Sequence, residues 1–215
     1  MSALVPPNEK QRLKVLWQYD VLDTIPEEVF DDLTELAARI CEAPIALITL
    51  VDEDRQWFKS KVGISDNETS RDISFCAHAI LQSDLFIVPD ATKDQRFAHN
   101  PLVTSDPKIR FYAGAPLITP DGHALGTLCV IDKVPRELRP DQKTGLRVLA
   151  RHVMTQLELR RRSQALAHAH KERERAQSHL DKARAQLAEL RRQLRRRKAR
   201  APGPRPNQPK KTRKT

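Results

Sequence analysis

Every aromatic residue of this 215-residue chain lies at or before Tyr112, so only the first part of the chain can build a large packed core. Residues 1–158 hold 18 basic and 24 acidic residues, a net charge of −6, whereas residues 159–215 hold 20 basic and 4 acidic residues, a net charge of +16. The sequence therefore predicts a core-forming domain over residues 1–158 followed by a strongly basic segment. This asymmetry favours an anionic partner for that segment, and a solvated arginine-rich helix is the alternative.

Nothing in the sequence resembles a targeting or membrane segment. The longest apolar run, Ile45–Val51, is far shorter than the roughly 18 residues that a membrane helix needs, and no signal peptide is recognised. Cys41, Cys76 and Cys129 are too few and too widely spaced for a disulfide framework. We therefore expect a cytoplasmic protein without a membrane span.

The hydrophobic pattern of the first domain alternates between helical and strand-like segments. Apolar residues recur at helical spacing over residues 13–17, 30–40, 74–81 and 140–157, and strand-like runs cover residues 45–51, 56–62, 86–89, 109–118 and 125–131. Polar residues 64–72 predict a loop, and residues 90–108 an irregular segment. Because short turns join most of the strands, the pattern predicts an α+β fold with an antiparallel sheet.

From Leu159 the pattern changes to a period of seven. Positions 159, 166, 173, 180, 187 and 194 are leucine except for Arg173. Three residues after 166, 173, 180, 187 and 194 come Ala169, Ala176, Ala183, Leu190 and Arg197. This spacing predicts a basic coiled coil over residues 159–200, with a single amphipathic helix as the alternative. Residues 201–215 contain four prolines and no large apolar side chain, which predicts a disordered basic tail.

Five segments within residues 16–159, about two thirds of the chain, resemble the GAF domains of bacterial sensor kinases and diguanylate cyclases. They follow one another in the order expected for that family. The segments are residues 19–60, "ETSRDISFCAHAI" at 68–80, "VPDATKDQRFAHNPLV" at 88–103, "IRFYAGAPL" at 109–117 and "GTLCVID" at 126–132.

The resemblance implies a sheet of five or six antiparallel strands, a ligand pocket on one face and terminal helices that often pair into a dimer. It does not identify the ligand or a cofactor, because family members bind cyclic nucleotides, bilins, haem or amino acids, or have no known ligand. Such domains usually precede an output domain, but no kinase, cyclase or phosphodiesterase segment follows here. We also recognise no catalytic constellation, so we expect a regulatory protein rather than an enzyme.

Nine residues are candidates for the ligand site. Trp57 either walls the pocket or lies in the core beneath a helix. Arg110 and Tyr112 share a strand face that suits a carboxylate or phosphate ligand, and the alternative for Arg110 is a structural ion pair with one of the domain's acidic residues. Asp94 and Arg96 either bind the ligand or pair with each other to fix their loop. The full set is Trp57, Arg71, Cys76, His78, Asp94, Arg96, Asn100, Arg110 and Tyr112.

Cys76 and His78 lie two residues apart, about 200° around a helix, so we do not expect them to cooperate. Cys76 lies near the proposed helix start at Ser74, where a thiol can become reactive, although a buried cysteine is commonly a small hydrophobic residue. The bilin-binding branch of the family has cysteine and histidine in sequence, whereas here Ala77 separates them. A chromophore is therefore not favoured.

A basic cluster near the C-terminus is the candidate for an anionic partner. Its charges suit sequence-independent contact with nucleic acid or with an anionic surface, and no aromatic residue accompanies them for base stacking. The cluster consists of Arg191, Arg192, Arg195, Arg196, Arg197, Lys198, Lys210 and Lys211.

These observations favour a sensory or regulatory protein that binds a small ligand, dimerises, and signals to a partner through its C-terminal helix. Two alternatives remain open. One is a redox enzyme resembling the free methionine sulfoxide reductases, which share the GAF fold. The other is a protein that binds nucleic acid or an anionic surface through its basic tail.

Overall fold

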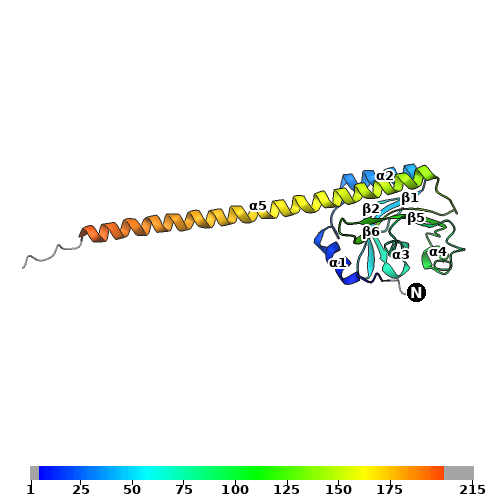
Figure 1. Cartoon of the computed structure of the whole chain (residues 1–215), viewed down its shortest axis with the longest axis horizontal. Coiled ribbons are helices and arrows are strands. Elements are labelled where there is room, and N and C mark those ends of the chain that lie inside the picture. The colour runs from blue at the N-terminus through cyan, green and yellow to red at the C-terminus, as the bar shows by residue number, and fades with distance from the viewer. Residues whose placement is uncertain (1–4, 201–215) are drawn as a thin grey trace, which may run out of the picture. The chain divides into compact units, whose positions relative to one another are not determined.

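A computed structural model describes residues 5–200 of the chain, and Figure 1 labels its elements. The predicted disordered tail over residues 201–215, with Lys210 and Lys211, lies outside the described residues. The helices are α1 (Glu9–Gln18), α2 (Glu28–Cys41), a 3-10 turn η1 (Arg71–Ile73), α3 (Phe75–Ala79), α4 (Pro101–Thr104) and α5 (Pro140–Arg200). The strands are β1 (Ile45–Val51), β2 (Arg55–Val62), β3 (Glu68–Ser70), β4 (Phe86–Val88), β5 (Phe111–Ile118) and β6 (Ala124–Asp132).

The six strands form one antiparallel sheet in the order β3-β2-β1-β6-β5-β4. Strand β1, one of the two central strands, is buried at every residue, which explains why its sequence is a nearly continuous apolar run rather than an alternating one. The antiparallel α+β fold predicted from the sequence is therefore confirmed.

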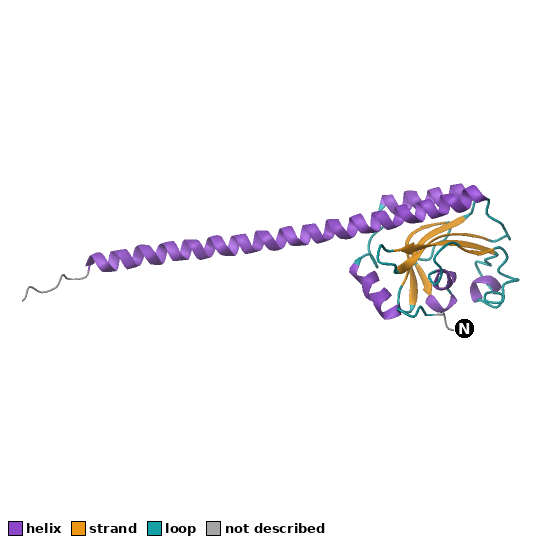
Figure 2. Cartoon of the chain, in the orientation of Figure 1, coloured by secondary structure: helices purple, strands orange, loops and turns teal. Residues whose placement is uncertain are grey.

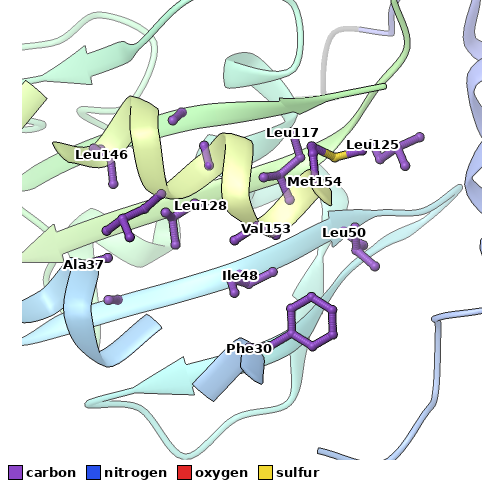
Figure 3. Close-up of a cluster of buried hydrophobic side chains, with 14 of the residues drawn as sticks. Phe30, Ala37, Ile48, Leu50, Leu117, Leu125, Leu128, Leu146, Val153 and Met154 are labelled. Atoms are coloured by element: carbon purple, nitrogen blue, oxygen red, sulfur yellow. The ribbon is translucent and has the colours of Figure 1, made fainter. Parts of the chain in front are cut away.

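Helices cover both faces of the sheet (Figure 2). Helices α1 and α2 and the first turns of α5 pack on one face, which we call the helix face, and α3 and α4 belong to the opposite α3 face. The core of the helix face brings Phe30 and Ala37 of α2 against Ile48 of β1 and Val153 of α5 (Figure 3). Residues of α5 thus form part of the domain's own core.

Two segments differ from the sequence prediction. Residues 68–70 form the edge strand β3, although the polar segment around them predicts a loop. Gln56 of β2 pairs with Thr69 through the backbone, and this pairing does not depend on apolar side chains. Within the predicted irregular segment, Asn100 caps the short helix α4 by accepting a hydrogen bond from the Leu102 N–H at 2.9 Å.

The chain divides into two compact units, residues 1–164 and 165–215. In the second unit, α5 presents several large exposed apolar side chains at the predicted heptad positions: Leu166, Leu180, Leu187 and Leu190. Arg191, Arg192, Arg195 and Arg196 also lie on this helix and are exposed. No helix within residues 5–200 is both long and apolar enough to cross a membrane.

Candidate functional site

The alternation of side chains along β2 decides which candidates reach the α3 face. Trp57 and Lys59 point to the helix face, where Trp57 is buried in the core and the Lys59 Nζ lies 5.2 Å from the centroid of the Phe30 ring. Phe58 belongs to the core of the α3 face. Trp57 is therefore a core residue beneath the helices, away from the other aromatic candidates.

A cluster of buried sulfur and hydroxyl groups lies at the centre of the α3 face. We call it the thiol cluster. The Cys76 Sγ lies 4.0 Å from the Cys129 Sγ, and it accepts hydrogen bonds from the Tyr112 hydroxyl at 3.3 Å and the Thr127 hydroxyl at 3.2 Å. The Thr49 hydroxyl lies 3.2 Å from that of Thr127. The cluster consists of Thr49, Cys76, Tyr112, Thr127 and Cys129, none of which is more than 2% exposed.

The hydrogen bonds around Cys76 favour its thiolate. Burial opposes ionisation, but the hydrogen bonds from Cys129, Thr127, Thr49 and Tyr112 outweigh it and lower the pKa of Cys76 to about 6. The same burial, together with the neighbouring Cys76, raises the pKa of Cys129 well above its ordinary value. The surroundings therefore favour ionisation of Cys76 over ionisation of Cys129.

Local sequence places the members of the cluster together. Ser74 caps α3 by accepting a hydrogen bond from the Ala77 N–H at 3.1 Å, which sets Cys76 in the first turn of the helix. Thr127 and Cys129 are two residues apart on β6 and therefore share a sheet face. In the adjacent strand β5, Gly114 lies opposite Cys129.

Aromatic rings cover the thiol cluster. The rings of Phe75 and Phe97 stack with centroids 4.0 Å apart and planes 9° from parallel, and the Phe75 ring lies 5.2 Å from that of Tyr112. Phe86 of β4 contacts Tyr112 with centroids 5.9 Å apart. Because these rings are buried, the cluster lies in an apolar environment.

Three predicted site residues meet at the edge of this aromatic layer. The His78 ring contacts the Phe97 ring edge-on at 4.8 Å, and the Arg96 guanidinium lies 4.7 Å from the Phe86 centroid. Asp94 holds Arg96 through a bond of 2.9 Å from Nε to Oδ1. Burial, and then the positive charge of Arg96, lower the pKa of His78. We call His78, Asp94 and Arg96 the rim.

The remaining predicted residues make contacts elsewhere. Arg71 Nη1 donates to Glu9 Oε1 at 2.6 Å and to the Asp52 carbonyl at 2.9 Å, while its Nε and Nη2 have no hydrogen-bond partner. Arg110 donates to the carbonyl of Val103 at 2.9 Å and that of Ile109 at 3.0 Å. Arg71 therefore ties η1 to α1 and to the turn after β1, and Arg110 ties the residue before β5 to α4.

Asn100 joins α4 to η1. Its side-chain amide donates to the Ile73 carbonyl at 2.9 Å while its oxygen caps α4. This residue therefore positions the segment that leads into Cys76.

Two openings border the first turns of α5 on the helix face. A groove of about 820 Å³ is lined by apolar side chains of α2 and α5, among them Leu36, Ile40 and Val148. A cavity of about 290 Å³ lies beside the ion pair between Asp84 and Arg147. The side chains of α2 and α5 therefore leave part of the helix face uncovered.

Sequence reasoning missed three members of the thiol cluster as site residues: Thr49, Thr127 and Cys129. Strand alternation places Thr127 and Cys129 on one face, which is a readable signal. The contact between Cys76 and Cys129, 53 residues apart, depends on where α3 crosses the sheet.

The architecture is thus an antiparallel sheet with long helices on one face and short helices over a buried polar cluster on the other. The model of the GAF domain family matches residues 26–157, more than half of the chain. The chain therefore belongs to the GAF domain family, which confirms the resemblance seen in the sequence.

Known proteins with the same domain include bacterial signalling proteins. A segment of 131 residues, 61% of this chain, is 47% identical to the cyclic di-GMP phosphodiesterase PA2567 of Pseudomonas aeruginosa, and the match spans 22% of that protein. The chain therefore corresponds to about a fifth of the length of this relative.

Two solved structures support the fold alone. The GAF domain of a phosphoenolpyruvate-protein phosphotransferase from Coxiella burnetii is 17% identical, with 73% of this chain and 98% of that chain covered and a TM-score of 0.52. The GAF domain of PixJ from Thermosynechococcus elongatus, in its blue-light absorbing form, is 14% identical, with 77% and 95% covered and a TM-score of 0.52.

Proposed function

We propose that this chain is a regulatory GAF module that binds a small ligand at the α3 face and signals to a partner through α5. One observation carries the proposal: α5 supplies buried side chains to the domain core, including Leu146, Val153 and Leu157, so a change inside the domain alters how this helix packs. A ligand that prefers one packing arrangement shifts the population toward it.

Strand β6 links the α3 face with α5. Cys129 belongs to the thiol cluster, whereas its neighbours Leu128 and Val130 belong to the helix-face core that α5 helps to form. Protein interiors are close-packed. A displacement of β6 that begins on the α3 face therefore changes the packing of side chains on the helix face as well. This connection supports the transfer of a signal across the sheet.

We further propose that the regulatory form is a homodimer. Leu166, Leu180, Leu187 and Leu190 are exposed and follow the heptad spacing of a coiled coil. A parallel pairing of two copies of α5 would cover these side chains. The paired helices would also pass a change of packing in the domain on to the signalling partner, as a change in the geometry of the coiled coil.

The relative from Pseudomonas aeruginosa supports a regulatory role. Its matching segment makes up 22% of a protein named as a phosphodiesterase, so a domain closely similar to this one occurs together with additional sequence in a signalling protein. We propose that the partner of this chain is likewise a signalling enzyme.

Native mass spectrometry of freshly purified full-length protein tests ligand binding and dimerisation together. The expected result is a dimer that carries additional bound mass, and weighing that mass gives the first information on the ligand. A monomer without bound mass would contradict both parts of the proposal. If the rim contacts the ligand, His78→Ala should lower the fraction of the protein that carries the bound mass.

Charge substitutions in the heptad positions test the dimer separately. The double variant Leu180→Lys, Leu187→Lys places ammonium groups in the predicted seam and should yield a monomer in sedimentation equilibrium. The matched control Ser178→Lys, Ala185→Lys adds the same charge to exposed positions outside the seam and should remain dimeric. The same oligomeric state for both variants would contradict the coiled coil.

A second candidate function rests on the basic cluster. Arg191, Arg192, Arg195 and Arg196 are exposed on α5 and suit contact with a phosphate backbone. We expect binding to duplex DNA of arbitrary sequence that weakens steeply with added salt and disappears when residues 191–215 are deleted. Binding that is unaffected by salt would contradict this function.

A further inference from the structure

The thiol cluster contains two thiols that face each other from different elements. Cys76 lies on α3 and Cys129 on β6, their Sγ atoms are 4.0 Å apart, and all three cysteines of the chain are unpaired. Cys41 lies at the end of α2 in the core of the helix face. The chain thus holds one close thiol pair and one separate buried thiol.

We propose that Cys76 and Cys129 are an oxidisable pair that forms an intramolecular disulfide when the protein meets a peroxide. This site is independent of the small ligand proposed above, because both reacting atoms and their hydrogen-bond donors belong to the chain itself. A peroxide would therefore act as a second input to the α3 face, in addition to any ligand.

The reaction balances in two steps. The Cys76 thiolate attacks one peroxide oxygen, so an S–O bond forms and the O–O bond breaks, and the departing hydroxide takes up the proton that Cys76 released. The sulfur of Cys129 then attacks the Cys76 sulfur, so an S–S bond forms and the S–O bond breaks, and the second hydroxide takes the proton of Cys129. Two thiols lose two electrons, and hydrogen peroxide becomes two waters.

The surroundings of the two sulfurs determine which of them reacts with the peroxide first. Three hydroxyl groups of the cluster favour the charged form of Cys76, which is the nucleophile toward peroxide. Cys129 stays protonated because it is buried beside Cys76. Cys76 therefore reacts first, and Cys129 resolves the sulfenic acid. Cys41, whose pKa burial raises to about 11, has neither the donors nor a neighbouring thiol.

Disulfide formation has a structural consequence for the domain. The sulfurs must approach from 4.0 Å to about 2.05 Å, which requires side-chain rotation or a movement of α3 toward β6. The Cys76 sulfur would also become a much weaker acceptor for the hydroxyls of Tyr112 and Thr127. Oxidation therefore rearranges the centre of the α3 face, beside the strand that connects it with α5.

Peptide mapping of oxidised full-length protein tests the proposal. Native protein is treated with hydrogen peroxide, quenched, denatured in the presence of a maleimide, and analysed as the intact mass and as peptides. The expected product has lost about 2 Da, carries one maleimide rather than three, and contains a peptide that links Cys76 to Cys129. Treatment with dithiothreitol should restore all three thiols.

Single replacements separate the roles of the cysteines. Cys41→Ala should form the link as the unchanged protein does. Cys129→Ala should form no link and should instead accumulate a sulfenic acid on Cys76 that dimedone traps. Because a core replacement can impair folding, the peptide map of the unchanged protein remains the primary result.

Cys41 also serves as an internal control for unfolding. If Cys41 oxidises as fast as Cys76, the reaction proceeds through the unfolded chain and the proposal is wrong. It is equally wrong if all three thiols survive peroxide in the folded protein, or if the recovered link joins Cys41 to another cysteine.

Discussion

The Tyr112 hydroxyl occupies the place where a side chain of residue 114 would begin. A Cβ atom on Gly114 would lie 2.2 Å from that hydroxyl oxygen and 2.8 Å from the ring carbon that bears it. Both residues point to the α3 face of β5, two positions apart. Because Gly114 has no side chain, the Tyr112 side chain can lie across it and donate a hydrogen bond to the Cys76 Sγ.

Replacing Gly114 by alanine should displace Tyr112 from the thiol cluster. We expect Gly114→Ala to lower the free energy of unfolding by about 2 kcal/mol, in the range of overpacked cores, as measured by urea denaturation. Tyr112→Phe removes the hydroxyl, the atom nearest to the added methyl group, so the same replacement should cost less in that background. Equal costs in the two backgrounds would show that Tyr112 does not occupy the space above Gly114.

The hydrophobic pattern of the sequence predicts most of the strands of this fold, but it does not predict the candidate site. The continuous apolar run Ile45–Val51 predicts β1 because it is covered on both faces, and the sequence likewise predicts four of the other strands. Strand β3 escapes prediction because it pairs through its backbone while two of its three side chains are exposed. Short-range patterns carry no information about pairings of this kind.

The candidate site likewise contains some contacts that sequence spacing predicts and others that it does not. Pairing between Asp94 and Arg96, two residues apart, is one of the two alternatives that the sequence leaves open, and the two side chains do form an ion pair. The contact between Cys76 and Cys129 could not be predicted, because it depends on the register of β6 and on where α3 crosses it. Local polar pairs follow from spacing, whereas long-range contacts follow from the topology of the sheet.

Oxidation of the thiol pair should depend on pH through the charge on Cys76. The groups that face its sulfur are the thiol of Cys129 and the hydroxyls of Tyr112, Thr127 and Thr49. With a pKa of about 6, the rate of disulfide formation at pH 5 should be about one tenth of its plateau and should change little above pH 7.

Tyr112→Phe is the matched variant for this measurement. It removes one hydrogen-bond donor to the Cys76 thiolate, which should raise the pKa of Cys76 and move the midpoint of the rate profile to higher pH. A rate that rises steadily through pH 8 in the unchanged protein would show that the hydroxyl groups do not stabilise the thiolate.

The rim should make stability fall as the solution becomes acidic. Burial and the nearby Arg96 lower the pKa of His78 in the folded protein below the ordinary value of 6.5, while Asp94 acts in the opposite direction. As the pH falls below 6.5, the unfolded chain binds a proton more readily than the folded one, so the free energy of unfolding decreases.

Urea denaturation between pH 7.5 and 5.5 measures this effect. His78→Gln should lose less stability over the interval than the unchanged protein, because its side chain does not titrate. His99→Gln is the matched control at an exposed histidine and should follow the unchanged protein. If the two variants lose stability equally, His78 is not held neutral by its surroundings.

The helix face contains a buried charge whose partner can be removed. The Lys59 side chain is fully buried, and its Nζ donates to Glu27 Oε1 at 2.6 Å, while Arg160 Nε donates to the same carboxylate at 3.0 Å. These two hydrogen bonds, and the charges behind them, lower the pKa of Glu27 against the effect of its partial burial. Glu27 therefore joins β2 to α5 within the first unit.

Replacing Glu27 by glutamine should destabilise the domain by about 3 kcal/mol, because it leaves the Lys59 ammonium buried without a counter-charge. Lys59→Met, which removes the buried charge itself, should cost less. The exposed neighbour Glu28 provides the control, since Glu28→Gln should change the free energy of unfolding by no more than about 0.5 kcal/mol. If Glu27→Gln behaves like Glu28→Gln, the Thr24 hydroxyl and the Ile25 carbonyl are sufficient to hold the ammonium group.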